Sequence, residues 1–277
     1  MSETEESNRH LDVSNHIVLV LDILGYSDLI LNNDETQMLN QFDSMVNSVR
    51  RDVAKMSDAN SRIRWKMYSD NFLIYAPLPD DEGLSHLTVK GVLMTGAWLQ
   101  FKLITEFGYM SRGGCCFGNM YVDESYVFGS GLVKAHVLEN GHREPTISVA
   151  ADVSDFLVSR CSGFYDPLES VSLVRRDDDR CYVDYMTHVA NMATRSVNEN
   201  RSHLRIDDTA RYHRIAYETK IRPRLMESIE RNRGNPDKVD GLKYKSRWFV
   251  EYHNTICEER CFPDEIIVIS DSSDLGI

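Results

Sequence analysis

One apolar run, residues 16–23, constrains the fold of this chain more than any other segment. Its sequence, His-Ile-Val-Leu-Val-Leu-Asp-Ile, is rich in β-branched residues and holds one carboxylate, Asp22, near its end. Such a run is typical of a strand that is buried on both faces of a sheet. A carboxylate in that position is costly to bury unless it is paired or bound to a cation. We therefore predict a central strand that presents Asp22 at its end.

The rest of the chain alternates between helical and strand periodicity. Residues 36–55 repeat apolar positions at helical spacing, whereas residues 62–67 alternate apolar with basic side chains, as in a strand with one polar face. Ser69, Asp70 and Asn71 form a predicted turn before a return strand. The remaining predicted elements are that strand (72–76), helices at 84–107, 129–139 and 152–159, strands at 111–121, 146–150, 171–175 and 181–186, and mostly helix over about 207–261.

This order of elements predicts the fold class. Helices segregated from a mainly antiparallel sheet give an α+β protein with a ferredoxin-like core and flanking helices. We predict a flexible arm at 1–12, the α+β domain at 13–188, a helical C-terminal extension at 189–269 and a flexible acidic tail at 270–277.

The composition excludes some classes of partner. The 277 residues carry a formal net charge of −12, which argues against general binding to nucleic acids or to anionic membranes. No apolar run approaches the ~20 residues that span a bilayer, and residues 1–12 lack the apolar core of a signal peptide. We expect a cytoplasmic protein whose six cysteines remain thiols.

One group of possible metal ligands recurs near the C-terminus. His253, Cys257 and Cys261 are spaced by four residues and would share one face of a helix. The group supplies three ligands without a partner cluster. We interpret it as a half-buried helix face rather than a metal site.

A second aspartate has a context like that of Asp22. Asp70 lies at the tip of the predicted hairpin, so the two carboxylates converge if the hairpin lies beside the central strand. Paired carboxylates suit Mg²⁺ or Mn²⁺ rather than zinc. The turn at Gly25 could present backbone N–H groups to phosphate oxygens. Taken singly, each aspartate also fits a turn or a helix cap, and it is their joint context that favours a metal site.

Several motifs, in this order, resemble those of the class III nucleotidyl cyclases. Residues 22–27 (Asp-Ile-Leu-Gly-Tyr-Ser) are similar to the end of the family's first strand, and Ser69-Asp70 to its hairpin Gly-Asp. Residues 112–118 (Arg-Gly-Gly-Cys-Cys-Phe-Gly) are similar to its Arg-x-Gly strand. Phe128-Gly129 and residues 135–139 (Ala-His-Val-Leu-Glu) resemble the helix that follows. The resemblance covers about residues 17–186.

The resemblance implies a two-metal mechanism. Asp22, Asp70 and the backbone carbonyl of Ile23 would hold two divalent cations, Mn²⁺ or Mg²⁺. The phosphates would lie against the backbone of the four following residues, Leu24, Gly25, Tyr26 and Ser27.

The resemblance also implies a homodimer with active sites at its interface, metal ligands coming from one chain and base-binding residues from the other. Arg64 and Tyr126 match the family's base-reading positions. The alternatives are a solvated strand face for Arg64 and a loop aromatic packed on the sheet for Tyr126. A bulky Tyr126 would disfavour purines, and an Arg64 directed at O4 would favour uracil over cytosine.

Two departures refine the resemblance. The family's transition-state Asn and Arg align with Val133 and Val137. Lys134 or His136 could replace them, and Arg175 and Arg176 could contact phosphate in their place, with a charged hairpin face as the alternative for the two arginines. As a whole, the chain resembles the bacterial anti-phage pyrimidine cyclases of the Pycsar type. That resemblance rests on the Ser-Asp-Asn hairpin, the helix at 129–139 and residues 243–249 (Lys-Tyr-Lys-Ser-Arg-Trp-Phe).

This resemblance implies an enzyme that converts UTP to 3′,5′-cyclic UMP and pyrophosphate. The product would activate a separate effector in anti-phage defence, and no nucleic acid or membrane partner is implied. Three alternatives remain: a cytidylate cyclase that acts on CTP, an adenylyl or guanylyl cyclase, and a catalytically silent cyclase-like module that binds nucleotide and signals.

Overall fold

The computed structural model describes residues 13–59, 62–159, 174–177, 180–198 and 206–268. Their strands form one sheet in the order β2-β3-β1-β4-β6-β8-β7, with β5 paired to β4. Among the strands in these ranges, only β4 and β6 pair in parallel. The predicted arm at 1–12 and tail at 270–277 lie outside these ranges. The protein is therefore α+β with a mainly antiparallel sheet, as the sequence predicts.

The first half of the chain forms the ferredoxin-like core. Its strands lie in the order β2-β3-β1-β4, and helices connect β1 to β2 and β3 to β4. This is the β-α-β-β-α-β arrangement that the predicted order of elements indicates. The elements are β1 (Ser14–Ile23), α1 (Tyr26–Asn32), α2 (Glu35–Ala59), β2 (Arg64–Tyr68), β3 (Asn71–Pro77), α3 (Glu82–Lys102), a π-helical turn (Leu103–Phe107) and β4 (Ser111–Val122).

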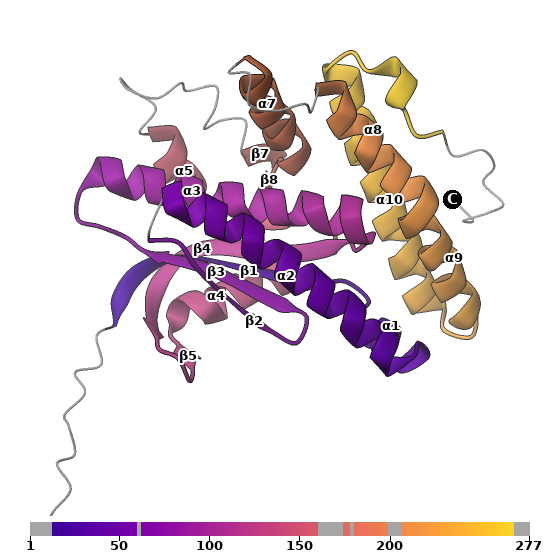
Figure 1. Cartoon of the computed structure of the whole chain (residues 1–277), viewed down its shortest axis with the longest axis horizontal. Helices are drawn as coiled ribbons and strands as arrows, with labels where there is room; N and C mark the ends of the chain where they lie inside the picture. Colours follow the sequence, from indigo (N-terminus) through magenta and orange to yellow (C-terminus); the bar gives the residue numbers. More distant parts are fainter. Residues whose placement is uncertain (1–12, 60–61, 160–173, 178–179, 199–205, 269–277) are drawn as a thin grey trace, which may run out of the picture.

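The second half completes the sheet and adds helices. Figure 1 shows α8, α9 and α10 together at one end of the molecule, next to α1. The elements are β5 (Val127–Phe128), α4 (Ser130–Asn140), β6 (Ile147–Val149), α5 (Ala151–Ser159), β7 (Val174–Asp177), β8 (Arg180–Val183), α7 (Tyr185–Asn198), α8 (Ile206–Ala216), a π-helical turn (Tyr217–Ile221), α9 (Arg222–Arg231), α10 (Pro236–Glu259) and a 3₁₀ turn (Pro263–Glu265).

Strand β1 is buried on both faces at the centre of the sheet, which confirms the prediction from its apolar run. Ile17 and Leu19 point toward α2 and α3, whereas Val18 and Val20 point toward α4, and all four are at most 1% exposed. On the second face, α4 packs so close to β4 that a Cβ at position 114 would collide with the helix backbone. Gly114, which has no Cβ, permits this close approach. Side chains two residues apart in a strand lie on the same face, so Asp22 lies on the α4 face of β1 together with Val18 and Val20.

One predicted strand was too long. We predicted that the strand at 181–186 extends to Met186, but β8 ends at Val183 and helix α7 begins at Tyr185. The reason is a helix cap: the Asp184 carboxylate accepts a hydrogen bond from the backbone N–H of Thr187 at 3.2 Å. The predicted strand at 171–175 also begins in residues outside the described part.

The C-terminal helices share the hydrophobic core of the sheet. Tyr217 and Phe249 are at most 1% exposed and belong to the same buried cluster as β1 and α3. Lys220 Nζ donates to the carbonyls of Thr105 (2.7 Å) and Glu106 (2.8 Å) at the end of the α3 segment. The extension is thus packed against the core, and a domain boundary at 188/189 stays a prediction.

The histidine and cysteine group of α10 lies largely inside this core. His253 is fully buried, and its Nδ1 lies 2.9 Å from Nδ1 of His213. Cys257 Sγ lies 3.3 Å from His253 Nε2, whereas Cys261 is exposed beyond the helix end. The described residues contain no group of three or more His, Cys, Asp or Glu placed to hold a metal, and no helix among them is long and apolar enough to cross a membrane.

Candidate functional site

The sheet brings Asp22 and Asp70 together. In β1, Asp22 pairs with Asn71 of β3 on one side and with Arg112 of β4 on the other. The backbone N–H of Ile23 donates to the Asp70 carbonyl at 3.2 Å, which ties the hairpin tip to the end of β1. The expected convergence of the two carboxylates is therefore present.

The β2–β3 turn holds Asp70 in a defined position. Ser69 has a φ of 56°, in the left-handed region that favours glycine, and stands where the cyclase motif has Gly. The Asn71 amide donates to the Asp70 carboxylate at 3.3 Å. Asp70 therefore directly follows a left-handed residue, and its carboxylate accepts a hydrogen bond from the neighbouring Asn71 side chain.

Two carboxyl groups in one partly buried place repel each other when both are charged. Burial raises the pKa of Asp22 to about 7, and the negative charge of Asp70 is the next largest cause. The negative charge of Glu139 and a side-chain hydrogen bond with Asp70 raise the pKa further, and the positive charge of Arg112 lowers it. The pair thus lacks positive charge, which a divalent cation would supply.

Arg112 offsets the repulsion of this pair only in part, because it is also paired with a carboxylate of α4. Its Nη2 donates to Glu139 Oε1 of α4 at 3.0 Å, and Glu139 is 4% exposed. The other Glu139 oxygen lies 2.9 Å from Nδ1 of His136. An ion pair therefore joins the Arg-x-Gly motif of β4 to the Leu-Glu motif of α4, and its arginine is the residue that pairs with Asp22 across the sheet. Both motifs are visible in the sequence, but the pairing of Arg112 with Glu139 was not predicted from them.

One cavity, of about 550 Å³, collects every residue predicted to hold metal or phosphate. Asp22, Asp70 and residues 23–27 form one wall. The opposite wall comes from the C-terminal helices α9 and α10, which the sequence analysis did not place near the site. Its cationic side chains are Arg224, Arg231, Lys238 and Lys245. The volume falls within the usual range for small-molecule sites.

The segment predicted to cradle phosphates is only partly available. The backbone N–H of Leu24 donates to the Met110 carbonyl at 2.9 Å, so this group cannot also bind phosphate. Gly25 has a φ of 82° and precedes the first residue of α1, Tyr26. The prediction for Gly25, Tyr26 and Ser27 stays untested.

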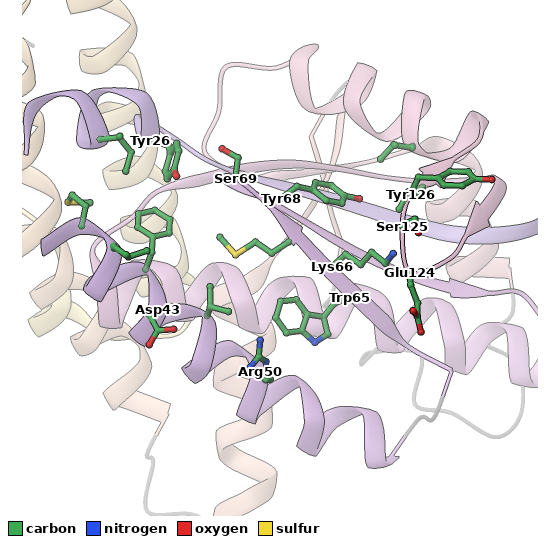
Figure 2. Close-up of a pocket in the computed structure, with 18 of the residues that line it drawn as sticks. Tyr26, Asp43, Arg50, Trp65, Lys66, Tyr68, Ser69, Glu124, Ser125 and Tyr126 are labelled. Atoms are coloured by element: carbon green, nitrogen blue, oxygen red, sulfur yellow. The ribbon is translucent and has the colours of Figure 1, made fainter. Parts of the chain in front are cut away.

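A second cavity, of about 1240 Å³, wraps around the edge strand β2 and holds Tyr126. Figure 2 shows Lys66 extending from β2 toward the loop of Glu124, Ser125 and Tyr126. Lys66 Nζ donates to the Asp123 carbonyl in that loop. The Tyr126 N–H donates to Asp123 Oδ1 at 2.9 Å, so one aspartate orders the loop beside the cavity.

Arg64 lines neither of these two cavities. It is exposed and lies opposite Tyr75 of β3, and its Nη1 donates to the carbonyl of Ile63 at 3.2 Å. The cation of β2 that lines the cavity of Tyr126 is instead Lys66, two residues further along the strand and on the same face. A role for Arg64 in reading a base stays a prediction, and the structure adds Lys66 as a second candidate.

The positions that depart from the cyclase pattern are apolar and exposed. Val133 and Val137 on α4 are 64% and 66% exposed. Among the suggested substitutes, Lys134 Nζ donates to the Phe117 carbonyl at 3.5 Å, and His136 contacts Glu139.

Arg175 was also suggested as a substitute, but it is engaged in ion pairs. It makes a bidentate pair with Glu259 of α10, at 2.6 and 2.8 Å, and also contacts Asp184. This supports the reading of a charged hairpin face. The Arg176 side chain lies outside the described residues.

Solved structures similar to this one include several nucleotide cyclase domains. The adenylyl cyclase CyaB from P. aeruginosa is 12% identical, with a TM-score of 0.43 over 54% of this chain and 83% of that one. The monomeric guanylyl cyclase domain of RhoGC from Blastocladiella emersonii is 12% identical, with a TM-score of 0.44 over 61% and 94%. No protein-family model and no curated protein matches the sequence. The likeness is too distant to assign an activity.

Proposed function

We propose that the protein is a metal-dependent nucleotidyl cyclase that converts UTP to 3′,5′-cyclic UMP and pyrophosphate. The observation that carries the proposal is the Asp22–Asp70 pair. Two carboxylates share one cavity, and burial and mutual repulsion raise the pKa of Asp22 to about 7. A pair of this kind is unfavourable without a cation, so its presence favours a function that uses one.

The donor set fits hard divalent cations. Asp22, Asp70 and the Ile23 carbonyl would hold two Mn²⁺ or Mg²⁺ ions, with the phosphate oxygens of the substrate completing the coordination. When bound, these ions would acidify the ribose 3′-hydroxyl and offset charge on the pyrophosphate that leaves. Chain residues would position the triphosphate in the cavity, so that the hydroxyl and the α-phosphate are aligned for attack.

The base would be read in the cavity of Tyr126. The ring of Tyr126 lies 5.3 Å from that of Tyr121, centroid to centroid, which supports a fixed aromatic wall. A pyrimidine fits beside such bulk more readily than a purine does. A cation directed at O4 of uracil, from Arg64 or Lys66, would face the amine of cytosine donor to donor, so UTP is favoured over CTP.

A second copy of the chain would complete the site. Phe128, Val133 and Val137 are each more than 60% exposed, on β5 and α4 next to Tyr126. Apolar side chains in such number on neighbouring elements are typical of an interface. We propose a C₂ homodimer in which metal ligands and base readers come from different chains.

The biological role is carried by the sequence resemblance alone. Cyclic UMP would act as a second messenger for a separate effector, in defence against phage. The C-terminal helices would belong to the enzyme rather than to the effector, because they line the catalytic cavity.

The test is to incubate the purified protein with UTP, CTP, ATP or GTP in the presence of Mn²⁺ and to identify the products by mass spectrometry. The proposal predicts cyclic UMP and pyrophosphate from UTP, and none from an Asp22→Asn variant. Cyclic CMP, AMP or GMP as the main product would keep the cyclase and change its substrate. Nucleotide binding without any cyclic product would favour the silent module, which the exposed valines at positions 133 and 137 also fit.

A further inference from the structure

One cation in the Asp22–Asp70 cavity differs from the others. The cavity is lined by Arg224, Arg231, Lys238 and Lys245, all from the C-terminal helices. Arg224 donates to two backbone carbonyls, at 2.8 and 3.1 Å. Lys238 pairs with Asp28 at 2.9 Å, and Arg231 lies 3.7 Å from a Glu227 oxygen. These three positive charges are therefore already matched by groups of the chain.

Lys245 has no such partner. Within the described ranges, its ammonium makes no hydrogen bond and no carboxylate lies within ion-pair distance, although the side chain is half-buried. Burial and the positive charge of Arg112 lower the pKa of Lys245, and the charge of Asp22 partly offsets them. An ammonium removed from water without a partner is unfavourable, and an anion bound in the cavity would offset that cost.

The backbone on both sides of Lys245 is fixed. The hydroxyl of Tyr244 donates to Glu144 Oε1 at 2.6 Å. On the other side, the Ser246 hydroxyl lies 2.8 Å from that of Tyr217, and both groups are buried. These two contacts hold this turn of α10 against the core. Lys245 is therefore presented to the cavity by a rigid element, as a preorganised binding group is.

We propose that the Lys245 ammonium binds the terminal phosphates of the nucleotide and neutralises the pyrophosphate as it leaves. The identity of the nucleotide rests on the proposed function, whereas phosphate binding by Lys245 can be tested without it. No proton is transferred: the ammonium donates hydrogen bonds to phosphate oxygens while the bond between the α-phosphorus and the bridging oxygen breaks. A helix outside the α+β core would thus supply positive charge that Val133 and Val137 cannot.

The direct test is binding of inorganic tripolyphosphate with Mg²⁺, measured by calorimetry on the full chain. Lys245→Met should weaken binding by roughly 10- to 100-fold, the usual range for a lost charge-assisted hydrogen bond. Lys245→Arg should retain most of the affinity. Arg247→Met is the matched control, because it removes the same charge from an exposed position on the same helix and should leave binding unchanged.

A stability measurement separates this role from a structural one. Without ligand, Lys245→Met should unfold at the same or a higher temperature, because it removes an unpartnered charge. A lower unfolding temperature together with unchanged tripolyphosphate affinity would show a structural role and overturn the proposal. Absence of tripolyphosphate binding to the unmodified protein would overturn it too. Lys245-dependent binding without cyclase activity would retain the phosphate site and reject the proposed function.

Discussion

The two cavities at the β1–β3–β2 side of the sheet differ in what they offer a ligand. The cavity of Asp22 and Asp70 is the smaller, about 550 Å³, and charged side chains face each other across it. The cavity of Tyr126 is more than twice as large and is lined mostly by apolar and aromatic residues. Within one chain, the charged groups suited to phosphoryl transfer and the apolar surface suited to base recognition therefore lie in different cavities. Tyr26 lines both cavities.

Removal of a carboxylate from the smaller cavity should have the greatest effect on activity. Asp22→Asn or Asp70→Asn should lower cyclisation at least ~10³-fold, beyond the ~10²–10³ typical of losing one hydrogen-bond donor, because a metal ligand is lost. Asp80→Asn, on an exposed loop, is the charge-matched control. Turnover with saturating Mn²⁺ and circular dichroism of each variant decide the matter. Near-normal turnover in either site variant would remove the carboxylates from the chemistry.

A complementation experiment asks whether the two cavities act across an interface. An Asp70→Asn chain should be inactive alone and an Arg64→Ala/Tyr126→Ala chain should turn over UTP poorly, and mixing them should restore activity with UTP. Random exchange gives about half heterodimers with one intact site each, hence roughly a quarter of wild-type activity. If subunits exchange and no activity returns, the nucleotide binds within one chain.

Base selectivity should respond only to the larger cavity. Tyr126→Ala should raise purine turnover relative to UTP, and loss of the cation that faces O4 should reduce the preference for UTP over CTP by about one to two orders of magnitude in kcat/KM. Comparing Arg64→Ala with Lys66→Ala identifies that cation. Unchanged ratios of kcat/KM in all three variants, with altered overall rates, would exclude this cavity as the base site.

The smallest expected effect is on stability without metal. The folded state raises the pKa of Asp22 to about 7, so the folded protein binds more protons than the unfolded chain at pH values between the ordinary aspartate pKa and 7. Stability contributed by the protonated carboxyl is therefore lost as the pH rises through that range. At pH 8, Asp22→Asn should raise the unfolding temperature by a few degrees, at about 2–4 °C per kcal/mol. Thermal scans at pH 5 and 8 test this: equal shifts at both would show that Asp22 is not titrating.

The sequence predicted the sheet better than the walls of the site. Apolar periodicity sufficed for β1 and for the helix of residues 82–102, because burial on a sheet imposes a fixed repeat. It missed α1, which follows Gly25 in a left-handed conformation and has no side-chain cap. It also extended a strand into helix α7, which Asp184 caps. Neither feature has a periodic signal.

The site residues on neighbouring strands were predicted from the sequence, whereas those contributed by helices much later in the chain were not. Asp22 and Asp70 lie on neighbouring strands, so a hairpin prediction brings them together. Lys245 reaches the same cavity from more than 170 residues further along the chain, through packing of α10 that no short-range pattern encodes. Arg64 shows the converse: its strand was predicted, but Arg64 lines neither cavity, whereas Lys66 of the same strand lines the cavity of Tyr126.

The most direct measurement is a crystal structure with Mn²⁺ and a non-cyclisable UTP analogue, with data collected at the manganese edge. The account predicts anomalous density between the carboxylates of Asp22 and Asp70, terminal phosphates against the Lys245 ammonium, and the uracil ring beside Tyr126. Manganese bound elsewhere, or a triphosphate that contacts neither Asp22 nor Asp70, would contradict it.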